Sequence, residues 1–140
     1  MSISRGPLFR ILDANFNRAR EALRVCEEIL RLGLNARMLS AQMKAARHAC
    51  SKILIAFPVP YRRLLACRDS ERDVGRRRTL ADAGCKPRIR DLFLANIKRA
   101  QEALRVLEEF SKIAAPGAAS RFQALRFKVY GLEKKSLPKF

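Results

Sequence analysis

Residues 14–28 read ANFNRAREALRVCEE, and residues 95–109 read ANIKRAQEALRVLEE. Aligned at an offset of 81 residues, the two stretches are identical at eleven of fifteen positions. Agreement of this extent does not arise by chance, so the chain contains an internal repeat. A weaker likeness follows downstream, where residues 43–48 (MKAARH) align with residues 122–127 (FQALRF) at an offset of 79. Each copy of the repeat therefore continues beyond its first helix.

The first copy is expected to form a long helix followed by a second one. Apolar residues recur at positions 8, 12, 16, 19, 23, 26 and 30, which is the spacing of a helix with one buried face. Pro7 suits the start of this helix and Gly33 suits its end. Asn35 is predicted to cap the second helix, which should extend to about Ala56, before two prolines.

The second copy predicts the same arrangement. Asp91 marks the start of its long helix, and the pair Pro116-Gly117 separates this helix from the last one. No stretch of the chain alternates between apolar and polar residues as a strand does. We expect a single all-α domain, residues 1–140, built as a helical bundle of two pseudo-symmetric helical hairpins. Repeat 1 covers about 7–57, a linking segment about 58–90, and repeat 2 about 91–137.

Composition limits the classes of protein that remain. The chain has 140 residues, of which 49% are hydrophobic, and this content excludes a disordered chain. Thirty Lys and Arg residues against 13 Asp and Glu give a formal charge of +17. Such a charge attracts anions, namely nucleic acid, phosphorylated metabolites or acidic membranes, and does not distinguish among them.

Several other classes are disfavoured. The longest uncharged stretch, residues 53–61, is too short to cross a bilayer, and the N-terminus has no apolar signal segment. We therefore expect a cytoplasmic protein with no membrane partner. The four cysteines have no CxxC spacing and His48 is the only histidine, so we expect reduced cysteines and no zinc site. No glycine-rich phosphate loop is present, so phosphate would be bound by Arg, Lys or helix N-termini.

The repeated helix places polar side chains beside its apolar face. In a helical projection Asn15 lies at the edge of the apolar stripe, Arg18 lies next to it, and Glu21 lies on the following face. The second copy repeats all three as Asn96, Arg99 and Glu102. A desolvated Asn needs a hydrogen-bond partner and a guanidinium needs an anion, which is either another side chain or a ligand. In a pseudo-twofold bundle the two sets would face each other across a cleft.

The linking segment contains a compact polar stretch, LLACRDSERDVG, at residues 64–75. Asp69 and Asp73 are four residues apart and could hold Mg²⁺ through water, as in phosphoryl-transfer sites. The alternative is a solvated loop in which Asp69 caps a turn and Gly75 adopts a positive φ. The basic run Arg76–Arg78 is most simply interpreted as a solvated loop, with contact to phosphate as the alternative. The lone His48 is most simply a packed or surface imidazole.

Three stretches together, at 11–28, 64–75 and 95–109, resemble a known family. It is the alternative, all-helical hydroxymethylpyrimidine-phosphate kinase family of thiamine biosynthesis, whose domain is often fused ahead of thiamine-phosphate synthase. The resemblance spans most of the chain in the same order. It implies transfer of the γ-phosphoryl group of ATP to hydroxymethylpyrimidine phosphate, a phosphorylated pyrimidine, to give the diphosphate. Mg²⁺ is then the expected cofactor, with ATP as co-substrate.

Roles at the matching positions follow from the chemistry of phosphoryl transfer. We expect Arg18, Arg99 and Arg68 to bind phosphate, and Asn15 and Asn96 to bind or orient the substrate. Asp69 and Asp73 are the expected Mg²⁺ ligands, and Glu21 or Glu102 would orient the acceptor. Positioning rather than base catalysis should dominate, because the acceptor is already a phosphate monoester.

Two other functions stay open at this point. One is a basic helical nucleic-acid-binding protein, which the charge favours although no zinc-finger or RNA-binding signature is present. The other is a non-catalytic partner of a separate thiamine-phosphate synthase. The sequence also leaves open whether the site lies within one chain or between the two chains of a homodimer.

Overall fold

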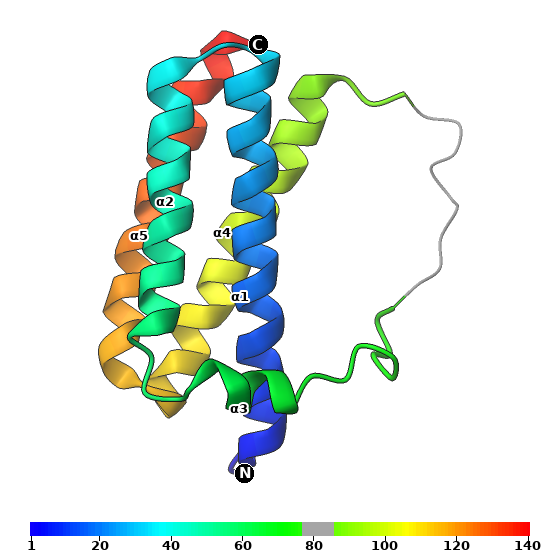
Figure 1. Ribbon diagram of the computed structural model, residues 1–140, viewed down its shortest axis with the longest axis vertical. Coiled ribbons are helices and arrows are strands. Elements are labelled where there is room, and N and C mark those ends of the chain that lie inside the picture. Colours follow the sequence, from blue (N-terminus) through cyan, green and yellow to red (C-terminus); the bar gives the residue numbers. More distant parts are fainter. Residues whose placement is uncertain (77–85) are drawn as a thin grey trace.

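Four long helices lie side by side and make up most of the molecule (Figure 1). The computed structural model describes residues 1–76 and 86–140; of the residues discussed above, Arg77 and Arg78 lie outside the described ranges. The long helices are α1 (Arg5–Glu28), α2 (Arg37–Ile55), α4 (Ile89–Ala114) and α5 (Pro116–Ser136). Three short elements complete the described chain: η1 (Ile29–Gly33), α3 (Tyr61–Ala66) and η2 (Leu137–Lys139). No strand occurs in the described residues, so the predicted all-α class is confirmed.

The helices form two hairpins, α1 with α2 and α4 with α5. Helix α1 packs on both α2 and α4, and α5 packs on both α4 and α2, which gives a four-helix arrangement. The chain runs in one direction along α1 and α5 and in the opposite direction along α2 and α4 (Figure 1). The two repeated helices, α1 and α4, are therefore antiparallel neighbours.

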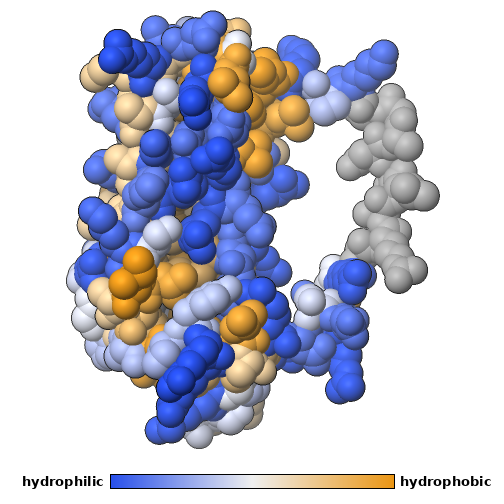
Figure 2. All heavy atoms as spheres, in the orientation of Figure 1, coloured by the Kyte–Doolittle hydropathy of each residue, from blue (hydrophilic) through white to orange (hydrophobic). Residues whose placement is uncertain are grey.

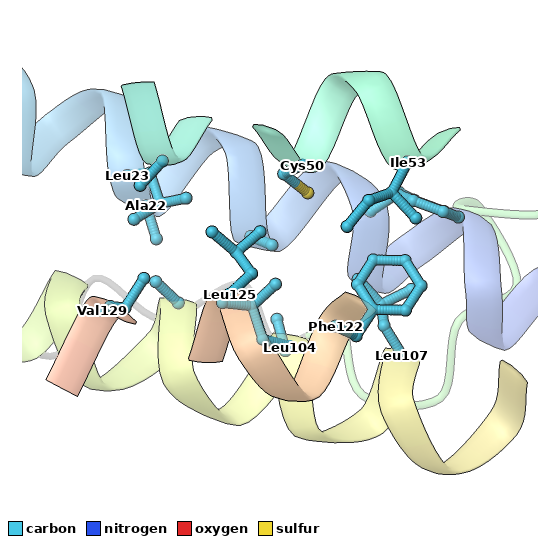
Figure 3. Packing of buried hydrophobic residues seen from close by; sticks show 14 of the residues in the cluster. Ala22, Leu23, Cys50, Ile53, Leu104, Leu107, Phe122, Leu125 and Val129 are labelled. Carbon is cyan, nitrogen blue, oxygen red and sulfur yellow. The ribbon is translucent and has the colours of Figure 1, made fainter. Parts of the chain in front are cut away.

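The apolar stripe predicted for the first helix forms one side of the core. Every one of its seven positions, from Leu8 to Leu30, is at most 4% exposed. Figure 3 shows the four long helices contributing to one apolar cluster that includes Ala22, Leu23, Cys50, Ile53, Leu104, Leu107, Phe122, Leu125 and Val129. Burial of each large apolar side chain contributes about 1.5–3 kcal/mol, so this stripe determines how α1 packs.

A buried ion pair joins the two helices of each hairpin. Glu27 of α1 accepts a hydrogen bond from Arg47 of α2 at 2.8 Å, and Glu108 of α4 accepts one from Arg126 of α5 at 2.9 Å. These are equivalent positions in the two copies, at the offsets of 81 and 79 found in the sequence. This explains why the first of the two adjacent glutamates at the end of each repeated motif is retained.

The start of α2 differs from the prediction. Its N-cap is Ala36, and Asn35 makes no side-chain cap; instead Asn35 has a φ of 49°. The physical reason is that α1 continues through the π-helical η1 to Gly33, so the chain must reverse within the three residues before α2. Asn is one of the few residues that tolerates the left-handed conformation needed there.

The remaining helix boundaries agree closely with expectation. Helix α2 ends at Ile55, one residue before the predicted end, and α5 begins at Pro116. Helix α4 begins two residues before Asp91, which lies in its first turn and pairs with Arg88. The short α3 was not predicted, because six residues are too few to show a helical period. Of the described helices, none combines the length and apolarity that crossing a bilayer requires.

Candidate functional site

A cleft of about 680 Å³ lies between α1 and α4, and the internal repeat supplies all of its walls. Its ten lining residues are five pairs of equivalent positions: Asn15 and Asn96, Arg18 and Arg99, Glu21 and Glu102, Ala22 and Ala103, and Val25 and Val106. We call it the twofold cleft. Its volume is in the range of small-molecule sites. The expectation that the two polar sets face each other is therefore met.

The two asparagines are oriented in the same way. Asn15 Nδ2 donates to the carbonyl oxygen of Ile11 at 2.9 Å, and Asn96 Nδ2 donates to that of Leu92 at 2.8 Å. Each side-chain amide nitrogen therefore donates its hydrogen bond within its own helix, to the carbonyl oxygen four residues earlier. The side-chain oxygen is left as a hydrogen-bond acceptor at the cleft wall, where it suits a ligand that donates, such as an amino or hydroxyl group.

The two arginines of the cleft are exposed and available. Within the described residues neither Arg18 nor Arg99 has an ion-pair partner at 4.0 Å or less. By contrast, the arginine six residues further along each helix is engaged, since Arg24 pairs with Glu28 at 2.7 Å and Arg105 with Glu109 at 2.9 Å. The end of the duplicated motif therefore holds the helix surface together through ion pairs. Its beginning faces the cleft, with guanidinium groups that have no ion-pair partner among the described residues.

A second pocket, of about 620 Å³, adjoins the cleft on the side of the first repeat. We call it the side pocket. It shares Asn15, Arg18 and Glu21 with the twofold cleft. Its other charged lining residues come from α1 and from the chain after α3: Arg10, Asp13, Arg68, Asp69 and Asp73. The structure thus brings every sequence-predicted site residue to one of two adjoining pockets.

Arg68 is anchored rather than free. Its Nε and Nη2 atoms donate to the two carboxylate oxygens of Asp13 at 2.7 and 2.9 Å, and Nη2 also donates to the Tyr61 hydroxyl at 3.3 Å. The hydrogen bonds to Asp13, followed by that to Tyr61, raise the pKa of Arg68. Only its Nη1 hydrogens are left without a partner among these bonds, so Arg68 can offer phosphate part of its guanidinium, not all of it.

Asp13 is a site residue that the sequence reasoning missed. Its side chain is 3% exposed, and it fixes the chain after α3 against α1 through Arg68. The signal was present in the repeat: the equivalent position in the second copy is Leu94, an apolar residue. A buried carboxylate in only one copy of a repeated core helix indicates a partner that only that copy has.

Asp69 and Asp73 both line the side pocket and both shape the loop. Asp69 Oδ1 accepts from the Arg72 amide at 3.2 Å, and Asp73 Oδ1 accepts from the Gly75 amide at 2.9 Å. The interpretation that Asp69 caps a turn is therefore correct for one of its oxygens, whereas the positive φ expected of Gly75 is wrong, since no described glycine has one. The described residues contain no group of three or more potential metal ligands. Proteins usually bind Mg²⁺ through one or two carboxylates, with water and ligand phosphates completing its shell.

The two pockets are acidic relative to the rest of the chain. Four arginines line them, Arg10, Arg18, Arg68 and Arg99, together with five carboxylates, Asp13, Glu21, Asp69, Asp73 and Glu102. These are five of only 13 acidic residues in a chain that has 30 basic ones. A surface built solely to attract polyanions would not concentrate carboxylates at these two pockets.

Other singled-out residues lie away from the pockets. His48 is exposed on α2 and lines none of the described pockets. Cys26 and Cys50 are buried, and burial raises the pKa of each thiol to about 12, so neither is a nucleophile at neutral pH. Arg76 is exposed, and the other two arginines of its run lie outside the described residues, as does Cys85.

Comparison with known proteins matches the part of the chain that contains the predicted site residues of both pockets. Residues 10–135 match the model of the family described as the ThiD2 family. The chain is similar to proteins named thiamine-phosphate synthase: 43% identical over 124 residues to that of Synechocystis sp., covering 89% of this chain and 34% of the relative. The protein of the same name from Nostoc punctiforme is 40% identical over 126 residues, covering 90% and 34%. The chain thus spans about a third of the length of the curated relatives it matches. No solved structure matches.

Proposed function

Because the chain belongs to the ThiD2 family, we propose that it acts in thiamine biosynthesis as a small-molecule kinase. The proposed reaction transfers the γ-phosphoryl group of ATP to hydroxymethylpyrimidine phosphate and yields ADP and the diphosphate. The place in thiamine biosynthesis is supported by relatives named thiamine-phosphate synthase. The kinase activity is supported above all by one observation: two arginines without an ion-pair partner among the described residues line a cleft of substrate size, together with two acceptor asparagines.

The substrate's chemistry matches the walls of the twofold cleft. The small apolar side chains Ala22, Val25, Ala103 and Val106 offer flat surfaces for a planar pyrimidine ring. The side-chain oxygens of Asn15 and Asn96 accept hydrogen bonds from its amino group or hydroxyl. Arg18 and Arg99 supply charge-assisted, bidentate contacts to phosphate.

Phosphoryl transfer needs positioning and charge stabilisation more than base catalysis. A phosphate oxygen of the acceptor attacks Pγ, the bond from Pγ to the β,γ-bridging oxygen breaks, and its electron pair leaves with ADP. The second pKa of a phosphate monoester is about 6, so the acceptor is already ionised at neutral pH. Glu21 or Glu102 would then orient the acceptor. Asp69 and Asp73 would hold Mg²⁺, which neutralises the phosphates of ATP when bound.

The direct test is incubation of the purified chain with Mg·ATP and hydroxymethylpyrimidine phosphate. We expect ADP and the pyrimidine diphosphate to form in equal amounts, which chromatography and ³¹P NMR would show. Formation of ADP alone, without diphosphate, would indicate hydrolysis of ATP by water and would overturn the proposal. Absence of both products across a range of pH and Mg²⁺ concentrations would overturn it as well.

Substitution of the cleft arginines tests where the activity resides. We expect Arg18→Ala and Arg99→Ala each to reduce kcat/KM by about 10²-fold or more, because each removes a charged donor to phosphate. Both residues are exposed, so the variants should unfold at the same temperature as the wild type. Arg121→Ala on α5, an exposed arginine that lines neither pocket, is the matched control. Full activity in either cleft variant would show that the arginine is not part of the site.

Association with thiamine-phosphate synthase is a second candidate, supported by the name that the relatives carry. A pull-down with a separately produced synthase would test it, with stoichiometric capture as the supporting result. A cytoplasmic location and a homodimer both stay predictions.

A further inference from the structure

The two copies of the repeat provide chemically different surroundings. The twofold cleft has the same five residues on each side, but the side pocket borders only the first copy and the chain after α3. At the positions of Asp13 and Asn17 in the side pocket, the second copy has Leu94 and Lys98. Duplication therefore produced one symmetric cleft, and divergence added a polar pocket beside one half of it.

We propose, resting on the kinase function above, that the two copies bind different substrates. The side pocket takes the metal complex of the nucleotide, with the terminal phosphoryl group at Arg18. The twofold cleft takes the pyrimidine phosphate, with its phosphate at Arg99. The two equivalent arginines of the repeated motif thereby bind different molecules: Arg18 binds the phosphoryl donor and Arg99 binds the phosphoryl acceptor.

Charge assigns the nucleotide to the side pocket. Asp13 is neutralised by Arg68, but Asp69 and Asp73 each keep a carboxylate oxygen that accepts no hydrogen bond from the described residues. These two carboxylates favour a polyphosphate that carries a divalent cation over a bare one. Arg10 and the remaining N–H groups of Arg68 can then bind the outer phosphate oxygens.

Shape and polarity assign the pyrimidine to the twofold cleft. Four of its ten lining residues are apolar, and together with two acceptor oxygens they suit a flat ring with a donor group, whereas only three of the thirteen residues that line the side pocket are apolar. Arg99 lines only the cleft, while Arg18 lines both pockets. Among the described residues, Arg18 is therefore the one cation placed to contact both the donor and the acceptor, and so the phosphoryl group that is transferred.

The phosphoryl group would move from the side pocket to the twofold cleft, where the two pockets meet at Arg18. The bond between Pγ and the β,γ-bridging oxygen breaks, and the electron pair stays on the β-phosphate of the departing ADP. An ionised oxygen of the pyrimidine phosphate supplies the pair for the new P–O–P bond, so no oxidant or external base is needed. Arg18 contacts the moving phosphoryl group and Arg99 holds the acceptor beside it.

Equilibrium binding tests the assignment without turnover. Mg·AMP-PNP, which does not transfer its phosphoryl group, and the pyrimidine monophosphate would be titrated separately into the wild type and three variants by calorimetry. We expect Arg99→Gln to weaken the pyrimidine phosphate at least tenfold and to change Mg·AMP-PNP less than twofold. The double variant Asp69→Asn, Asp73→Asn should show the reverse, because Asn keeps the loop hydrogen bonds but loses the charge. Arg121→Gln, the third variant, should change neither.

Kinetics provide a second readout. Arg99→Gln should raise KM for the pyrimidine phosphate while KM for ATP stays unchanged, and Arg18→Gln should lower kcat with both substrates saturating. Equal weakening of both ligands by Arg99→Gln would overturn the assignment. So would unchanged Mg·AMP-PNP binding in the double Asp variant, or a wild type that binds neither ligand. Missing product in the turnover assay, with the binding pattern intact, would instead overturn the kinase function alone.

Discussion

Asp13 shows how one substitution in a repeated helix changes a core position into an anchor. Its carboxylate is buried in α1, and the two hydrogen bonds from Arg68 satisfy it. Since the second copy carries Leu94 at the same position, an apolar residue is compatible with the helix packing there. The ion pair therefore positions Asp69 and Asp73, which follow Arg68 in the chain, more than it stabilises the bundle.

This interpretation predicts unequal effects of removing the two partners. Arg68→Ala should lower the free energy of unfolding by about 3 kcal/mol, because it leaves a buried carboxylate without a cation. Asp13→Leu should lower it by less than about 1 kcal/mol, because Arg68 is 37% exposed and can turn into water. Urea unfolding at neutral pH measures both values. Equal losses of unfolding free energy in the two variants would contradict the prediction. Both variants should also weaken nucleotide binding, because each removes the ion pair that positions Asp69 and Asp73.

At the scale of the elements, each hairpin is closed by contacts between its own two helices. The Glu27–Arg47 and Glu108–Arg126 pairs occupy equivalent places. The second hairpin has an additional link, in which Glu133 of α5 accepts hydrogen bonds from Lys98 at 3.0 Å and from Gln101 at 2.6 Å on α4. Burial alone would raise the pKa of Glu133, but these two hydrogen bonds outweigh it and lower the pKa below its ordinary value of 4.5.

The lowered pKa predicts a pH-dependent contribution to stability. A carboxyl group whose folded pKa lies below its unfolded one stabilises the fold above the unfolded value, and this stabilisation is lost as the pH falls through the folded value. We expect Glu133→Gln to unfold more easily than the wild type by about 1–2 kcal/mol at pH 7. The gap should shrink steadily below pH 4.5 in urea titrations at a series of pH values. A gap that does not change with pH would show that the charge of Glu133 has no part in it.

At the scale of the whole molecule, the charge of +17 and the candidate site are separate properties. Hydrophilic residues dominate the face seen in Figure 2, and the apolar residues on it form small groups. The two pockets concentrate carboxylates instead of following the basic excess. We interpret most of the positive charge as a solvated surface that attracts anions without distinguishing among them.

A salt titration separates this general attraction from the site. Binding to duplex DNA of arbitrary sequence should weaken steeply as salt rises from about 50 to 200 mM, and the slope should be nearly the same for the wild type and for Arg18→Ala, Arg99→Ala. Kinase activity should depend on the two arginines and much less on salt. Tight DNA binding at physiological salt that is lost in the cleft variants, with no phosphoryl transfer, would favour the nucleic-acid alternative.

The sequence by itself determined the fold class, the core stripe of α1 and the identity of the paired motif. These follow from the helical periodicity of apolar residues and from the internal repeat, and both can be read directly from the order of residues in the sequence. Only the tertiary structure decided that five equivalent pairs line one cleft, because this depends on how α1 and α4 pack against each other. The same is true of Asp13 and Arg68, which are 55 residues apart and meet only because α3 returns the chain to α1. Contacts between distant residues depend on the packing of whole elements, and no local pattern records them.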